Sequence, residues 1–579
     1  MSILQRCILV VVFASLAACA PQPTAPAESA PIDPPPAEQS ATPQTLERPE
    51  AVAKHDTGRV RAEQELRQLH DAAVAGKAVQ HYSSAVVAGE RVAPSLVPPP
   101  VAPGFNREGY DHIAENGFRD PRLSPLSTFG LDVDTTSYSN VRRFLSQGRL
   151  PPADAVRIEE LVNYFDYSYP APGQGEVLSV STELSQAPWN PAHQLALIGV
   201  RAQAPTTRQP NRLVFLIDTS GSMNAADKLP LLKRSFQILV ESLRPEDSVA
   251  IVTYAGSAGL VLPITSGVHK ESIYAALNQL HAGGSTAGAR GIELAYQVAQ
   301  QQFLAEANNR VILATDGDFN VGQSSQGELV RLIEARRDQG VFLTVLGFGS
   351  GNYQDGRMQA LADHGNGAHY YIDTDREADR IFRDKLSGTL YTVAKDVKLQ
   401  IEWNPSRVAR YRLIGYENRM LNPEDFVDDK KDAGELGAGH QVTALYELVP
   451  ADGAESAPPL RYQSREAATR PAAELGLVKW RYKAPLASQS SERRVVIRDQ
   501  ARDIAQSSPN LRWAASVAEL GLLLRASEHR GQASFDALIA RAEPLTGQGA
   551  DAALRREFIG LSRQAKLASQ PQLGMAPAR

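Results

Sequence analysis

The chain has 579 residues, of which 22% are charged, and a formal net charge of −5. This length is sufficient for two or three domains with buried cores. The small negative charge argues against a nucleic-acid partner, which would require a basic surface.

The amino terminus predicts export from the cytoplasm. Arg6 precedes an apolar run over residues 7–16, which is too short for a permanent membrane span but has the length of a signal-peptide core. The Leu-Ala-Ala-Cys motif that ends at Cys19 resembles the lipobox of bacterial lipoproteins. That resemblance implies a signal peptide over residues 1–18 and a lipid on the Cys19 sulfur; an ordinary signal peptide that contains a cysteine is the alternative. Ala20 then favours the outer membrane over the inner membrane.

Residues 19–120 are predicted to be a disordered tether. Stretches 21–43 and 94–103 are rich in proline and cannot bury enough apolar surface to offset chain entropy, although residues 59–78 have the pattern of one amphipathic helix. A tether of about 100 residues spans on the order of 50 Å. Because Cys7 leaves with the signal peptide and Cys19 is acylated, we expect no disulfide or thiolate metal site in the mature protein.

Residues 121–210 are predicted to be an ordered flanking region. Residues 128–134 read as a short strand, and apolar spacing of three and four predicts helices over 137–148 and 157–165. Further strands are expected at 177–184 and 195–200.

Residues 211–394 have the clearest pattern, that of a doubly wound, Rossmann-like α/β domain. Short apolar runs without alternation are typical of strands buried on both faces, and helix-patterned segments separate them. The strands are predicted at 213–217, 249–252, 311–314 and 341–346, and the helices at 229–243, 291–303, 328–336 and 378–390. Strands that alternate with helices give a parallel sheet covered on both sides.

Residues 395–505 are predicted to be rich in β-strands, and residues 506–579 are predicted to be helical. Apolar and polar residues alternate over 397–403, which is the pattern of a strand with one wet face, and strands are also expected at 442–448 and 475–482. Because strands of this kind lie on both sides of the α/β domain, we expect an antiparallel sheet or sandwich into which that domain is inserted. The helical tail is expected over 510–568.

Three loops of the predicted α/β domain carry side chains with oxygen atoms. Asp218, Ser220 and Ser222 come directly after the first buried strand, Thr286 lies in a glycine-rich loop before a helix, and Asp316 follows the strand at 311–314. Taken singly, each loop reads as a helix cap or a turn. In open α/β sheets, however, ligands bind at the carboxyl ends of the strands, where such loops meet.

This ordered set resembles the metal-ion-dependent adhesion site of von Willebrand factor type A (VWA) domains. The resemblance implies that Asp218, Ser220, Ser222, Thr286 and Asp316 hold a divalent cation, directly or through water. Hard oxygen ligands favour Mg²⁺, with Mn²⁺ and Ca²⁺ as alternatives, and the absence of His and Cys disfavours zinc. In the family a carboxylate of a protein partner, from Asp or Glu, completes the coordination of the ion.

Several neighbouring residues are interpreted as structural. Asp318 and the glycines Gly347, Gly349 and Gly351 read as turn residues, and Asp247 reads as the start of a strand. For His364 and His369 we expect surface or packing roles, because the sequence gives no argument for pairing either with a carboxylate.

Residues 120–570 as a whole resemble a group of bacterial lipoproteins in which short regions precede and follow the VWA domain. Residues 129–140, 157–165 and 314–320 carry this likeness. We therefore expect an envelope-anchored protein that binds a protein partner and is not an enzyme. Two alternatives stay open: a structural envelope lipoprotein without metal-dependent binding, and an envelope hydrolase, although no Gly-x-Ser-x-Gly, His-Glu-x-x-His or phosphate-binding loop occurs.

Overall fold

The computed structural model describes most of the chain beyond residue 107. The described residues are 108–131, 134–204, 208–284, 288–317, 326–351, 353–385, 388, 390–431, 433–451, 473–485, 487–547 and 550–570. The predicted signal peptide, Cys19 and the tether as far as residue 107 lie outside these ranges, as do Thr286 and Asp318. In the described part of the chain, no helix is both long and apolar enough to cross a membrane.

The α/β domain is built on one sheet with strand order β6-β5-β4-β7-β8-β9. Its strands are β4 (Asn211–Asp218), β5 (Ser248–Tyr254), β6 (Ala258–Ser266), β7 (Asn308–Thr315), β8 (Phe342–Phe348) and β9 (His369–Ile372). All neighbours pair in parallel except β6, which is antiparallel to β5 at one edge. The apolar run in β4 is fully buried, as expected for a strand covered on both faces.

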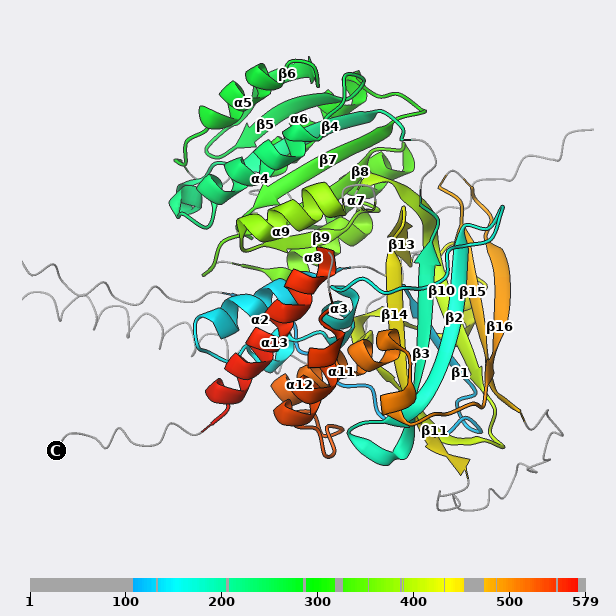
Figure 1. Cartoon of the computed structure of the whole chain (residues 1–579). Coiled ribbons are helices and arrows are strands. Elements are labelled where there is room, and N and C mark those ends of the chain that lie inside the picture. The colour runs from blue at the N-terminus through cyan, green and yellow to red at the C-terminus, as the bar shows by residue number, and fades with distance from the viewer. Residues whose placement is uncertain are drawn as a thin grey trace, which may run out of the picture. The chain divides into compact units, whose positions relative to one another are not determined.

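Alternate side chains of β4 point into two separate cores, one on each face of this sheet. Phe215 packs with Phe236 of α4, whereas Val214 packs in the core that holds Ile292 of α6. Helices α4 (Leu229–Glu241) and α5 (Lys270–Asn278) cover the first face. Helices α6 (Gly288–Gln301), α7 (Gln326–Asp338) and α8 (Asp355–His364) cover the second, as Figure 1 lets the reader follow. The predicted doubly wound architecture is therefore confirmed.

The last predicted helix of this domain, over residues 378–390, is confirmed in its described parts but is not regular. α9 (Asp375–Asp379) continues as one π-helical turn, Arg380–Asp384, and residues 388 and 390 are again helical. Ile381 and Phe382 already reach the core within that turn. Leu390, which completes the apolar pattern, is helical and is buried in the same core, just before strand β10 begins.

Two antiparallel sheets flank the α/β domain and pack against each other. One has the order β12-β1-β10-β15-β16 with β13 beside β10, and the other has the order β11-β14-β3-β2. The first contains β1 (Leu126–Gly130), β10 (Thr392–Trp403), β12 (Met420–Leu421), β13 (Gly434–Gly437), β15 (Glu474–Lys483) and β16 (Ser491–Arg498). The second contains β2 (Leu178–Ala187), β3 (Asn190–Ala202), β11 (Val408–Ile414) and β14 (Gln441–Pro450).

Side chains from both flanking sheets share one core, which includes Leu399 and Ile401 of β10 and Ile198 of β3. The chain leaves this sandwich after β3, forms the α/β domain, and returns with β10. The insertion predicted from the alternating patterns on either side of the α/β domain is thus confirmed.

Helices from the two ends of the described chain form a further core. They are α2 (Thr136–Ser146) and α3 (Ile158–Asn163) from the leading region, and α11 (Pro509–Leu524), α12 (Phe535–Ala542) and α13 (Ala550–Ala568) from the tail. Phe165 contacts Trp513 and Phe558 edge to face, with ring centroids 5.1 and 5.8 Å apart. The same core includes Leu197 of β3, so these helices cover the outer face of the second sheet (Figure 1).

A buried ion-pair network joins α2 to the α/β domain. Arg142 of α2 is paired with Asp373 and donates to Glu377 (2.8 Å) and to Glu557 of α13 (3.1 Å). Burial alone would raise the pKa of Glu377, but the charges of Arg380 and Arg142 and their hydrogen bonds outweigh it and hold the pKa at about 2. These fully formed contacts fix the flanking helices against the carboxyl edge of the α/β sheet.

Candidate metal-ion site

Asp218 is the last residue of β4, so its side chain emerges at the carboxyl edge of the sheet. Its Oδ1 accepts a hydrogen bond from the Ser220 amide (2.8 Å), and its Oδ2 accepts from the hydroxyls of Thr315 (3.2 Å) and Tyr254 (3.3 Å). Burial raises the pKa of Asp218 to about 6, and the charge of Asp316 adds to this rise against the effect of those hydrogen bonds. The carboxylate is thus held in one orientation by neighbours from two strands, β5 and β7, and from the loop after β4.

Ser220 and Ser222 lie next to Asp218, where the chain begins a single 3₁₀ turn, Gly221–Asn224. Their hydroxyl oxygens are 3.0 Å apart, so both point toward the same region of space. The Gly221 amide donates to the Gly284 carbonyl (3.1 Å), and the Gly283 amide donates to the Thr219 carbonyl (2.8 Å). These bonds tie the first loop of the motif to the loop that leads to Thr286. Thr286 itself lies outside the described residues.

Asp316 follows β7, the parallel neighbour of β4, and is 1% exposed. Its Oδ2 accepts a hydrogen bond from the Lys228 ammonium, 2.8 Å away. Lys228 did not appear among the residues predicted for the site. The sequence gives only a weak signal for Lys228, which is a lysine just before an amphipathic helix. Only the tertiary structure shows that this lysine is buried.

The donor set fits a hard divalent ion. The described residues of the motif offer carboxylate and hydroxyl oxygens, which are the ligands that Mg²⁺ and Mn²⁺ take in proteins. Asp316 is close enough to Asp218 for its charge to raise the pKa of Asp218. Within the described ranges, no group of three or more His, Cys, Asp or Glu side chains is arranged to hold a metal. A cation here therefore depends on hydroxyl ligands in addition to the two aspartates.

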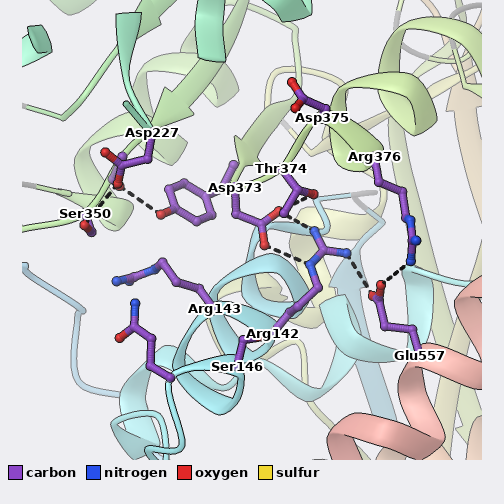
Figure 2. Close-up of a pocket in the computed structure, with 13 residues that line it drawn as sticks. Arg142, Arg143, Ser146, Asp227, Ser350, Asp373, Thr374, Asp375, Arg376 and Glu557 are labelled. Atoms are coloured by element: carbon purple, nitrogen blue, oxygen red, sulfur yellow. Dashed lines mark hydrogen bonds and ion pairs between the residues drawn. The ribbon is translucent and has the colours of Figure 1, made fainter. Parts of the chain in front are cut away.

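A cavity of about 620 Å³ lies beside this edge of the sheet, between α2, α13 and the loop after β8. Figure 2 shows Arg142 directed at Asp373 and Glu557, and Ser350 beside Asp227. The Ser350 hydroxyl donates to Asp227 (3.1 Å). The charged groups that line the cavity are largely paired with one another, so they join the domain to its flanking helices.

The residues interpreted as structural have identifiable contacts. The Asp247 carboxylate accepts from the amides of Asn211 (2.7 Å) and Arg244 (2.8 Å), which confirms its structural role. Gly349 has a φ of 77°, as a turn residue in the left-handed region does. His364 lies at the surface, as expected, and its Nδ1 lies 2.9 Å from Glu334 Oε1. That pairing was not predicted, because Glu334 is on α7, 30 positions away in sequence.

His369 is buried inside the α/β domain. Its Nε2 lies 3.3 Å from the Tyr353 hydroxyl, and its amide donates to Asp134 of the leading region (3.0 Å). The expected packing role of this histidine is therefore confirmed.

Comparison with known protein families identifies the class of each region. The von Willebrand factor type A domain model matches residues 213–384, which contain the α/β sheet and the site at its carboxyl edge. A second model, described as von Willebrand factor, matches residues 104–197, and the model for the carboxyl-terminal region of the uncharacterized protein YfbK matches residues 388–567. The fold and the site thus define a VWA protein with flanking regions of its own.

The chain is 42% identical over 470 residues to the uncharacterized protein YfbK of Escherichia coli (strain K12), covering 79% of this chain and 81% of that protein. It therefore belongs to the YfbK family of VWA-containing proteins. Human inter-alpha-trypsin inhibitor heavy chain H3 is 27% identical over 195 residues, which are 32% of this chain and 22% of that one. A solved structure titled von Willebrand factor type A, from Catenulispora acidiphila, is 18% identical with a TM-score of 0.37, covering 67% of this chain and 88% of that one.

Proposed function

We propose that the protein is an envelope-anchored lipoprotein whose VWA domain binds a protein partner through a divalent cation. Asp218, Ser220, Ser222, Thr286 and Asp316 would hold the ion. The observation that carries the proposal is the convergence of two buried carboxylates and two adjacent hydroxyls, from loops after two neighbouring strands, at one point of the carboxyl edge. When bound, the ion would supply an electrophilic centre for an Asp or Glu carboxylate of the partner.

Binding fits this arrangement better than catalysis does. The described hydrogen-bond partners of Ser220 and Ser222 are each other and Asp218, whereas a serine nucleophile needs a histidine or another base within reach. Glycine in the loop that leads to Thr286 allows one backbone segment to approach another closely. At Gly284, where φ is 83°, an added Cβ would lie 3.2 Å from the Gly256 amide nitrogen. The loops are therefore shaped to present oxygen atoms at fixed positions.

The anchoring part of the proposal rests on the amino-terminal sequence. Cys19 after the apolar core would carry the lipid, Ala20 favours the outer membrane, and the proline-rich tether would let the VWA domain reach a partner away from the membrane surface. Expression in Escherichia coli with radiolabelled palmitate tests it. We expect label in the parent and none in Cys19→Ser; label in neither would contradict lipidation.

Metal binding is tested by calorimetric titration of detergent-solubilised full-length protein with Mg²⁺, Mn²⁺ and Ca²⁺. We expect saturable binding in the parent and in Asp338→Ala, whose side chain is 70% exposed, and no binding in Asp218→Ala. Circular dichroism must show that Asp218→Ala is folded. Absence of binding at millimolar metal, both in the parent and after removal of the Lys228 charge that pairs with Asp316, would contradict the cation site and favour a structural envelope protein that works without metal.

A further inference from the structure

Lys228 is a buried cation inside the proposed metal site. Its side chain is 7% exposed, that of Asp316 is not exposed at all, and Nζ lies 2.8 Å from Asp316 Oδ2. Lysine is almost never buried unless it is paired. The ammonium therefore compensates a carboxylate that the proposed function assigns to the divalent ion.

The backbone around Lys228 fixes where its ammonium points. Lys228 caps the amino end of α4, where its amide donates to the Ala225 carbonyl (3.0 Å) and its carbonyl accepts from Leu232 (2.8 Å). The aliphatic stem crosses Gly349 so closely that a Cβ there would lie 2.2 Å from Lys228 Cγ and 2.6 Å from Cε. The next residue, Ser350, is bonded to Asp227, the neighbour of Lys228, as Figure 2 shows. Because Gly349 has no side chain, the Lys228 stem can pass over it and reach Asp316.

The charges at this site put the lysine and the metal ion in competition. Asp218 and Asp316 carry two negative charges, and Lys228 returns one positive charge. A divalent ion that uses Asp316 must either displace the ammonium or accept it as a near neighbour of the same sign. Both alternatives weaken ion binding, and the repulsion is strong because the groups are shielded from water.

We propose that Lys228 is an internal counter-ion that competes with the divalent cation for Asp316 and so lowers the affinity of the site. This inference rests on the proposed function of the site. In the protein without metal, Lys228 keeps Asp316 paired, which avoids the destabilisation of an isolated buried charge. With the ion bound, the site has an excess of positive charge, which the carboxylate of a partner neutralises. The lysine therefore makes tight retention of the ion depend on the partner.

The test is a calorimetric titration of full-length protein with Mn²⁺ in the absence of a partner. Lys228→Met removes the charge, and Lys228→Gln removes the charge but keeps a donor toward Asp316. Lys228→Arg keeps the charge, and Lys233→Met removes a half-buried charge from α4, the helix that Lys228 caps. We expect the dissociation constant to fall about tenfold or more in the Met and Gln variants, which corresponds to about 1.4 kcal/mol. The Arg and Lys233→Met variants should bind like the parent.

A second readout covers the folding of the variants. In chelator, Lys228→Met should melt at a lower temperature than the parent, because Asp316 is left unpaired, and Mn²⁺ should raise its melting temperature more than that of the parent. If the Met variant does not fold in chelator, the Gln variant carries the comparison.

The outcomes separate this inference from the proposed function. Unchanged or weaker binding in both neutral variants, with binding in the parent and none in Asp218→Ala, would overturn the counter-ion role and leave the cation site standing. Binding in the neutral variants alone would support the inference, because the lysine then excludes the ion completely. Binding in none of the proteins would overturn both.

Discussion

Glu159 is a carboxyl group buried where α3 meets the turn after β11, and its replacement by glutamine predicts a pH-dependent gain in stability. Glu159 is 9% exposed, and its Oε2 has no hydrogen-bond partner among the described residues. A Cβ at Gly415 would lie 2.4 Å from that oxygen, which shows how tightly the turn covers it. Burial, followed by the charges of Glu417 and Glu160, raises the pKa of Glu159 to about 8, against the opposing charge of Arg157.

The sign and size of the effect follow from proton linkage. The folded protein holds the Glu159 proton up to about pH 8, whereas the unfolded chain releases it near its ordinary pKa of 4.5. The stability that this group contributes is complete below pH 4.5 and is lost as the pH rises through about 8. At about 1.36 kcal/mol per pH unit, the loss amounts to about 5 kcal/mol at most. A cavity of about 10 Å³ borders Glu159 and has room for one water, so we expect about 2 kcal/mol.

The assay is urea unfolding of the parent and Glu159→Gln at pH 5, 6, 7 and 8, followed by circular dichroism. Glutamine does not ionise, so the variant should match the parent near pH 5 and exceed its unfolding free energy by about 2 kcal/mol at pH 8. Glu306→Gln, at an exposed position, is the matched control and should follow the parent at every pH. A constant difference between Glu159→Gln and the parent across this range, or a growing destabilisation of the variant, would refute the reasoning.

Three further changes probe the packing around the site. Arg142→Met should destabilise the fold by about 3–5 kcal/mol in thermal melts, because it leaves buried carboxylates unpaired, whereas Arg376→Met, 63% exposed, should cost less than about 1 kcal/mol. Phe236→Ala should cost about 3–5 kcal/mol in urea unfolding, because its ring stacks on another phenylalanine at 4.3 Å, and Phe303→Ala, 42% exposed, should cost clearly less. Gly349→Ala should lower the melting temperature, since φ is 77° and the methyl group would overlap the Lys228 stem; an unchanged melting temperature would contradict the close packing described above.

Local patterns in the sequence predicted much of the fold. The continuous apolar run of β4 indicates a strand buried on both faces, and the alternation of apolar and polar residues in β10 indicates a strand buried on one face. Both patterns are visible in consecutive residues. Six of the described strands were not predicted: β6, β9, β11, β12, β13 and β16. Two of them belong to the α/β sheet. β6 lies at an edge and contains Pro263, and β9 has only four residues, so neither has a periodic pattern long enough to detect.

The candidate site could be predicted from the sequence where its residues are close together in the chain or follow a predicted strand. Asp218, Ser220 and Ser222 lie at alternate positions within five residues, and Asp316 follows a recognisable strand, so the order of the motif is visible in the sequence itself. Its electrostatic balance was not predictable, because Lys228 and Asp316 are 88 positions apart and meet only when β4 and β7 pair in register.

The sequence by itself determined the class of each segment and the candidate oxygen ligands after the first strand, since these depend on neighbours a few residues away. Only the tertiary structure decided which charges meet. Arg142 pairs with Asp373, which is 231 positions away in the sequence. The leading helices share a core with the tail helices, although neither sequence segment indicates its partner. The physical reason is that periodicity records which face of an element is buried, whereas the partner of a buried charge is set by sheet order and by the path of the chain between elements.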